Sequence, residues 1–222
     1  MSAGLLRLPY TADVSDQQPV QPSLRDRKRA RTRQALVDAA IDLFDRDGYE
    51  GTTIADIAAA AEVGSRTVFN SFASKEELLF PESDARVQAT VEAIAARGPQ
   101  DGPTDVLLRA LRTVGANDDD MAGGLAELRL RLIRTVPAVR GRALQLQLEA
   151  QREIARHLHQ AFPDTLDEVA AAAVTGAFIG AITAALQVLL EQADRPDDPA
   201  EFHRVLRRAT DLALAPWSAQ SA

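Results

Sequence analysis

The chain has 222 residues, of which 46% are hydrophobic and only 5% are aromatic, and it contains no cysteine. This length accommodates a small domain joined to a larger one, and the abundance of alanine, leucine and arginine favours an all-α fold. The lack of cysteine excludes disulfides, thiol nucleophiles and cysteine-ligated zinc, and it agrees with a cytoplasmic location. A net charge of -7 excludes a protein that coats DNA nonspecifically with a basic surface.

Charge is unevenly distributed near the start of the chain. The apolar pieces of residues 1–22 are too short for a secretory signal, and we expect this segment to be a flexible tail. Between Leu24 and Arg33, six basic residues stand against one acid, Asp26, giving a local charge of +5. They are Arg25, Arg27, Lys28, Arg29, Arg31 and Arg33. The asymmetry predicts an anionic partner at this end of the molecule; the alternative is the solvated start of a basic helix.

Two helical patterns follow the basic stretch. Apolar residues recur at helical spacing over residues 36–44, and Asp47 with Gly48 supplies a stop signal. The next pattern begins at Thr53, and Asp56 stands three positions later, where its carboxylate can accept from free NH groups of the first turn. We therefore expect a first helix and then a short, well-capped second helix.

A third short helix is predicted over residues 65–72, after a turn through Val63 and Gly64. Val68 and Phe72 are four positions apart and define an inner face, which leaves hydrogen-bonding side chains on the outer face. A short capped helix, a turn and a second short helix with a polar outer face form a helix-turn-helix.

The outer face of this helix-turn-helix supplies candidate DNA contacts. Arg66 and Asn70 are the side chains expected to read guanine and adenine in the major groove. Hydroxyl groups, helix starts and cations suit phosphate oxygens, and we assign that role to Thr53, Ser65, Thr67, Phe69, Lys75, Arg29 and Arg31. Three of these have other readings: Thr53 as a cap only, Phe69 as a half-buried core residue and Lys75 as a solvated lysine.

The rest of the chain is predicted to be helical. Ser74 and Glu77 form a capping-box pattern that begins a fourth helix, which runs to about Arg97 and is kinked or interrupted by Pro81. Five further helical patterns cover residues 104–115, 122–136, 138–162, 164–193 and 199–215. No strand pattern competes with these helices.

One of the later patterns contains 22 residues, 169–190, without a charge, which is long enough to span a membrane. Its many alanines and its acidic flanks favour instead a central helix buried by its neighbours on most sides. Gly176 and Gly180 would let another helix approach closely, so we expect a dimer interface formed with residues 199–215. Packing inside one subunit, or space for a ligand, is the alternative.

Patterns of catalytic or metal chemistry are weak. His157 and His159 point to different faces of one helix and His203 is distant, so the three give no evident metal site. The consecutive acids of residues 118–120 are expected to be solvated. No glycine-rich phosphate loop or nucleophile elbow is present. We expect neither an enzyme nor a bound cofactor or metal.

Three segments resemble the N-terminal domain of the TetR family: ALVDAAIDLF at 35–44, GYEGTTIADIA at 48–58 and VGSRTVFNSFASKEEL at 63–78. The resemblance implies a homodimer, usually a repressor, that binds pseudo-palindromic operator DNA and releases it when a small-molecule effector binds the C-terminal domain. It implies a DNA-binding domain over 23–80 and a sensing and dimerisation domain over 81–222. The recognition helix would be Arg66 to Phe72.

Two features qualify the resemblance. The family often has an aromatic residue where Ser71 stands. It also often has a serine and then a glycine early in the turn, where this chain has Gly64 and Arg66. In the second half, residues 131–140 and the helix over 142–157 resemble the branch containing the mycofactocin-system regulator, which implies an acyl-thioester or other lipophilic effector. A helical protein-interaction adaptor without sequence-specific DNA binding is the alternative function.

Overall fold

The computed structural model describes residues 23–116, 124–191 and 199–218, all of whose regular elements are helical. The elements are α1 (Leu24–Arg46), α2 (Ile54–Ala60), α3 (Ser65–Ser71), the 3-10 helix η1 (Glu76–Leu79), α4 (Ser83–Ala95), α5 (Pro103–Ala116), α6 (Gly124–Thr135), α7 (Pro137–Ala161), α8 (Glu168–Glu191) and α9 (Pro199–Ser218). The all-α expectation is confirmed. The predicted tail, residues 1–22, and the acids of residues 118–120 lie outside the described residues.

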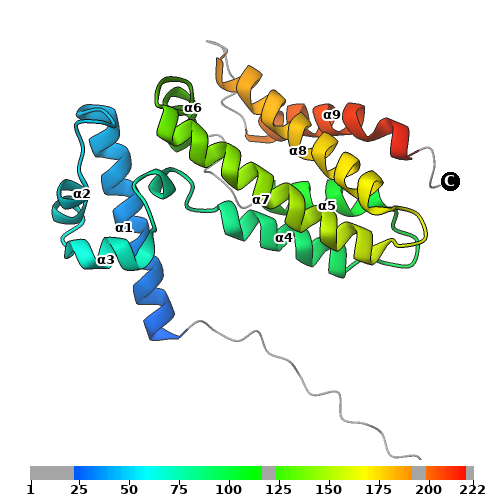
Figure 1. Ribbon diagram of the computed structural model, residues 1–222, viewed down its shortest axis with the longest axis horizontal. Coiled ribbons are helices and arrows are strands. Elements are labelled where there is room, and N and C mark those ends of the chain that lie inside the picture. Colours follow the sequence, from blue (N-terminus) through cyan, green and yellow to red (C-terminus); the bar gives the residue numbers. More distant parts are fainter. Residues whose placement is uncertain (1–22, 117–123, 192–198, 219–222) are drawn as a thin grey trace, which may run out of the picture.

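Helix α1 begins earlier than the apolar pattern alone indicates. Ser23 is its N-cap: the Ser23 hydroxyl accepts from the backbone N–H of Asp26, and the Asp26 carboxylate accepts from the backbone N–H of Ser23. This capping box starts the helix at the head of the basic stretch. The basic side chains are therefore carried on the first turns of α1, which project from the body of the molecule (Figure 1).

The predicted interruption of the fourth helix at Pro81 is confirmed, but the part before the interruption is shorter than expected. Residues 76–79 form only the single turn η1, and a regular helix resumes as α4 at Ser83. The Glu77 carboxylate accepts from the backbone N–H of Ala73 rather than capping a continuous helix. Pro81 has no N–H to donate and cannot continue the helix, so the interruption falls at this residue. A connector of residues 79–82 thus joins the first three helices and η1 to α4.

The helices form two groups (Figure 1). Helices α1, α2 and α3 pack at one end, and α4, α5, α7, α8 and α9 form a bundle at the other, with α7 alongside both α4 and α8. The hydrophobic cores do not follow this grouping of helices. The first core, between α1, α2 and α3, also includes Leu128 and Leu132 of α6 and Val139 of α7. The first core therefore crosses the domain boundary predicted at residue 80.

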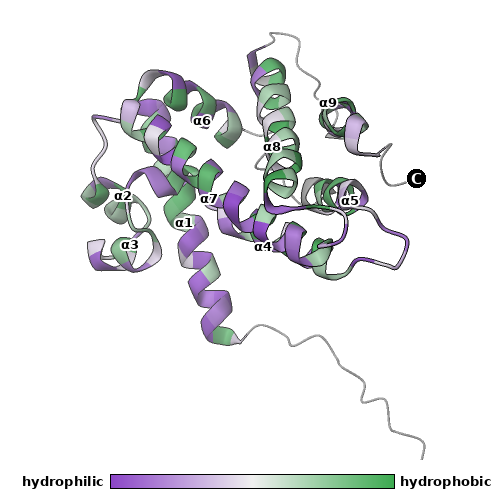
Figure 2. Ribbon diagram, turned by 45° about the vertical axis from the view of Figure 1, so that its right-hand side comes forward, coloured by the Kyte–Doolittle hydropathy of each residue, from purple (hydrophilic) through white to green (hydrophobic). Residues whose placement is uncertain are grey.

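Helix α8 is less buried than expected. It is long and apolar enough to cross a membrane by length and composition, and Figure 2 shows its mostly hydrophobic colouring. Only 28% of that stretch is buried. One face packs on α7 and α9, and the opposite face exposes apolar residues: Val169, Ala172, Ala173, Ala184 and Val188. The expectation of burial on most sides is wrong for the single chain. A Cβ added at Gly176 or Gly180 would meet no atom within 4 Å, so neither glycine serves packing inside the chain.

Candidate DNA interface and ligand cavity

The helix-turn-helix begins with the predicted cap. The Thr53 hydroxyl accepts from the backbone N–H of Asp56 at 3.2 Å, and the Asp56 carboxylate accepts from the Thr53 N–H at 2.9 Å. Donation by the Thr53 hydroxyl, at 2.6 Å, and by the Thr53 N–H to the Asp56 carboxylate lowers the pKa of that carboxyl group. The cap reading of Thr53 is confirmed; because its hydroxyl is exposed, a phosphate contact stays a prediction.

Helix α3 presents the expected two faces. Val68 and the following Phe72 are buried in the first core, and Ser65, Arg66 and Asn70 are exposed. Phe69 is 60% exposed, which excludes its reading as a half-buried core residue. An exposed aromatic ring beside polar side chains on a short helix is a surface suited to contact with a partner.

The basic start of α1 lies beside α3. A surface groove is lined by Arg25, Lys28 and Arg29 of α1 and by Thr67 and Asn70 of α3. The fold therefore brings the predicted base-reading Asn70 together with cations that are about 40 residues away in sequence. The α1 side of this groove is strongly hydrophilic (Figure 2). Arg31 and Arg66 are exposed but do not line the groove.

Arg33, the last cation of the basic stretch, faces the interior. Its guanidinium donates to the carbonyl oxygen of Ser71 at 2.6 Å and to that of Pro81 at 3.1 Å. It also lies 4.0 Å from the centre of the Phe72 ring. Arg33 therefore joins the end of α3 to the connector, a role that the charge pattern did not reveal.

Lys75 is also occupied inside the protein. Its ammonium donates to the carbonyl oxygens of Tyr49 at 2.8 Å and Thr52 at 3.0 Å, and it stands 3.9 Å from the centre of the Tyr49 ring. The reading of Lys75 as a solvated lysine is wrong, and its phosphate contact stays a prediction. Burial and the neighbouring Glu76 carboxylate, which accepts from the Tyr49 hydroxyl, raise the pKa of Tyr49.

The histidines His157 and His159 each have a hydrogen-bond partner within the protein. His157 lies 3.0 Å from the Glu153 carboxylate, and His159 Nδ1 lies 2.8 Å from the carbonyl oxygen of Leu166. Across the described ranges, no group of three or more His, Asp or Glu side chains is arranged to hold a metal ion.

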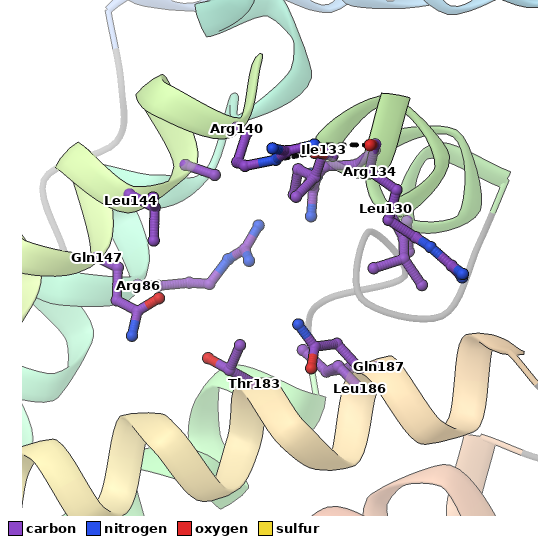
Figure 3. Close-up of a pocket in the computed structure, with 13 residues that line it drawn as sticks. Arg86, Leu130, Ile133, Arg134, Arg140, Leu144, Gln147, Thr183, Leu186 and Gln187 are labelled. Carbon is purple, nitrogen blue, oxygen red and sulfur yellow. Dashed lines mark hydrogen bonds between the residues drawn. The ribbon is translucent and has the colours of Figure 1, made fainter. Parts of the chain in front are cut away.

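The second half of the molecule contains a cavity that the sequence did not locate. Its outer chamber, of about 610 Å³, lies among α4, α6, α7 and α8. Four arginines line it: Arg86, Arg129, Arg134 and Arg140. Arg86 extends into the space between Arg140 and Thr183 (Figure 3). Arg140 is positioned by its donation to the carbonyl oxygens of Ile133 and Arg134.

An inner chamber of about 310 Å³ adjoins the outer one, since Arg86, Arg129 and Leu186 line both. Its wall is mainly apolar, and helices α4, α5, α7 and α8 contribute to it the side chains of Val87, Leu111, Ile154, Phe178 and Ile182. The outer chamber thus has four arginines, two of which also reach the inner chamber, and the rest of the inner wall is mainly apolar. That distribution suits an elongated molecule with an anionic end and an apolar end.

Comparison with known families matches both halves of this architecture. Residues 36–80 match the family described as "Bacterial regulatory proteins, tetR family", and residues 101–217 match the family described as "MftR C-terminal domain". The second match alone spans more than half of the chain. The protein therefore belongs to the TetR family of bacterial regulatory proteins, and residues 36–80 match the helix-turn-helix domain of that family.

Individual relatives agree with this assignment. The HTH-type transcriptional regulator TcmR of Streptomyces glaucescens is 35% identical over 62% of this chain and 63% of its own length. The HTH-type transcriptional repressor LfrR of Mycolicibacterium smegmatis is 34% identical over 40% of this chain and 46% of its own length. The chain thus matches less than two thirds of the length of each of these regulators.

Solved structures share the fold. A TetR-family regulator from Syntrophomonas wolfei superimposes with a TM-score of 0.58 at 19% identity, covering 83% of this chain and 96% of the other. Thermus thermophilus FadR, a TetR-family repressor in complex with lauroyl-CoA, gives a TM-score of 0.50 at 20% identity, covering 82% of this chain and 93% of the other. At these identities the likeness concerns the fold alone.

Proposed function

We propose that the protein is a homodimeric repressor that binds a pseudo-palindromic operator and leaves it when a small-molecule effector enters the cavity. The groove shared by Arg29, Thr67 and Asn70 carries the proposal, because it combines phosphate-binding cations with a helix that fits the major groove. The protein would act in the cytoplasm. We assign it no enzymatic activity, cofactor or metal.

In this proposal, α3 enters the major groove. Arg66 and Asn70 read bases, while Ser65, Thr67 and Phe69 lie against the sugar-phosphate backbone. Arg29 and Arg31 contact phosphates on the flank, because they are exposed on the part of α1 that projects beside α3. Thr53 and Lys75 are the remaining phosphate contacts. The Lys75 ammonium keeps one donor for an anion, whereas the Thr53 hydroxyl would have to turn its hydrogen from the Asp56 carboxylate to the phosphate.

A second copy of the chain would cover α8. The apolar stripe from Val169 to Val188 is uncovered in the single chain, and Leu212 of the adjacent α9 is 70% exposed. Gly176 and Gly180 leave room beside α8 for the partner's helix. A twofold dimer places two recognition helices about 34 Å apart, one helical turn of DNA, which gives the affinity that a single short helix lacks.

The effector would be an amphipathic anion. Four arginines line the outer chamber and attract a negative head group, and the inner chamber accepts an apolar chain. An acyl-thioester fits this description, and the lauroyl-CoA complex of Thermus thermophilus FadR shows that the fold can hold such a molecule. Effector binding would favour a conformation in which the two recognition helices no longer match successive major grooves.

The test is selection of bound sequences from a random pool of duplex DNA. We expect the wild type to enrich a palindrome and the double variant Arg66→Ala, Asn70→Ala to enrich none. Arg46→Ala is the matched control, because it also removes one exposed arginine but from the opposite end of α1. Lack of enrichment by the wild type would favour the protein-interaction adaptor instead. Loss of enrichment by Arg46→Ala as well would show that α3 is not the reader.

A further inference from the structure

The connector between the two halves is held from the sensing side by one arginine of the cavity. Arg129 of α6 donates from Nε to the carbonyl oxygen of Leu79 at 2.5 Å, and its guanidinium lies 5.5 Å from the centre of the Phe80 ring. The same side chain lines both chambers of the cavity. Arg129 therefore touches the ligand space and the connector at once.

The connector is held from the DNA-binding side by Arg33. Two residues after Leu79, the carbonyl oxygen of Pro81 accepts from Arg33, which also donates to the carbonyl oxygen of Ser71, the last residue of the recognition helix. Residues 79–81 thus stand between two arginines. A shift of this segment would be transmitted through Arg33 to the end of α3.

Two other arginines join the halves without lining the cavity. Arg142 of α7 forms an ion pair with Glu77 of η1 at 2.5 Å, and both side chains are largely buried. Arg131 of α6 pairs with Asp45 of α1 at 2.6 Å on the surface. Neither arginine lines either chamber, so a ligand has no direct access to these two links.

We propose that Arg129 is the positioning residue through which the cavity controls the DNA-binding half, and that only an anionic ligand operates it. This inference rests on the proposed function. A carboxylate or phosphate in the outer chamber carries a full negative charge that the Leu79 carbonyl lacks, so it draws the Arg129 guanidinium towards the chamber and strains the Nε hydrogen bond to Leu79. Release of Leu79 frees the connector, while the Arg142–Glu77 pair remains as the pivot.

The proposal separates occupancy from switching. An uncharged molecule of the same length fills the apolar inner chamber but gives Arg129 no anion, so the connector stays held. Its binding would block the effector without lowering operator affinity, since a ligand shifts an equilibrium only by its differential affinity for the two states. The sign of the ligand's charge, rather than its apolar chain, would then decide the response.

Dodecanoate, lauroyl-CoA and the uncharged dodecanol are the probes for the test. Because the chain has no cysteine, Ala60→Cys on α2 and Gln145→Cys on α7, both exposed, can be spin-labelled alone. Mixing labelled with excess unlabelled chain gives one label pair per dimer. We measure the distance distribution by pulsed electron spin resonance, and operator affinity in parallel, with each probe at saturation.

We expect dodecanoate or lauroyl-CoA to shift the distribution and to lower operator affinity by about 5- to 150-fold, and dodecanol to do neither. Arg129→Gln should show the shifted distribution and the lowered affinity without any probe. Arg131→Gln is the matched control on the same helix; it should keep the wild-type distribution and response, because exposed ion pairs contribute little.

Two results would overturn the proposal: a ligand-free distribution of Arg129→Gln equal to that of the wild type, or an equal shift by dodecanol and dodecanoate. If none of the probes binds the wild type, the proposed effector class fails, and the ligand-free comparison still decides the role of Arg129. Should Arg129→Gln lose its helical circular dichroism, Arg129→Lys replaces it; this variant keeps the charge, lacks the Nε donor and is expected to show the same shift.

Discussion

The two halves of the molecule use the same kinds of apolar residue but fill space differently. In the DNA-binding half, Leu36, Phe44, Ile57 and Val68 are fully buried around one core, and the outward side chains are polar. In the sensing half, the bundle leaves a chambered cavity, and α8 leaves an apolar face uncovered. A surface that reads DNA needs a rigid support, whereas a sensor needs volume and surface that another molecule can occupy.

The halves are also joined more closely than a linker would join them. Helix α6 contributes Leu128 and Leu132 to the first core, while its Leu130 and Ile133 line the cavity. One helix therefore has a face in each region. Close-packed cores transmit displacement rather than absorb it, so a change at the cavity face of α6 reaches the DNA-binding half.

The largest expected effect concerns the uncovered face of α8. Ala173→Glu places a charge in the proposed interface, and a buried unpaired charge costs about 3–5 kcal/mol, which corresponds to at least about 100-fold in dimer dissociation. Sedimentation should show monomers at micromolar concentration, together with a loss of operator binding. Ala138→Glu, at an exposed position of α7, is the control. A dimer that survives Ala173→Glu would move the interface away from this face.

Because α6 contributes to both the first core and the cavity, truncating a leucine should lower the free energy of unfolding by different amounts on its two faces. Leu132→Ala removes a buried residue of the first core and should lower the free energy of unfolding by about 2–5 kcal/mol. Leu130→Ala, on the cavity face, should cost about 1–2 kcal/mol because it is only half-buried. Urea unfolding gives both values, and hydrogen exchange should show faster exchange in α1 for Leu132→Ala alone. Equal costs would contradict the two-faced description of α6.

Replacing an alanine by leucine should lower the stability of the protein more in the first core than in the cavity. Ala40→Leu overfills the dense first core and should destabilise the protein by about 1–3 kcal/mol. Ala143→Leu, at a residue that lines both chambers, has free volume to enter and should cost less than about 1 kcal/mol. It should instead weaken the binding of lauroyl-CoA, measured by calorimetry. If Ala143→Leu destabilised as much as Ala40→Leu, the cavity would not be open volume.

The smallest expected effects distinguish residues that contact phosphates from residues that read bases in the DNA-binding half. Arg29→Ala removes one proposed phosphate contact and should reduce the dependence of log operator affinity on log salt concentration by about 1. Asn70→Ala should leave that slope unchanged and relax discrimination at one base pair by about 1–3 kcal/mol. Titrations between low and moderate salt distinguish the two. A slope unaffected by Arg29→Ala would remove this residue from the phosphate contacts.

Local signals in the sequence determined most of the fold. The capping pair of Thr53 and Asp56 and the spacing of apolar residues predicted the helices, since both act within one or two turns. The cap at Ser23, which starts α1 twelve residues before the apolar pattern, was not predicted. The motif resemblance identified the TetR family, which the comparisons confirm. The interruption of the fourth helix at Pro81 was predicted correctly, because the missing N–H acts locally; the capping pattern of Ser74 and Glu77, however, starts only the single turn η1.

Only the tertiary structure decided which groups share a site. Nothing in the sequence around Arg33 or Lys75 distinguishes them from the exposed Arg29, yet both donate to backbone carbonyls far along the chain. The four cavity arginines come from three helices, and Arg129 meets Leu79 across 50 residues. Helical periodicity states which face of a helix is apolar, but not which helix lies opposite; the packing of the whole bundle makes that choice.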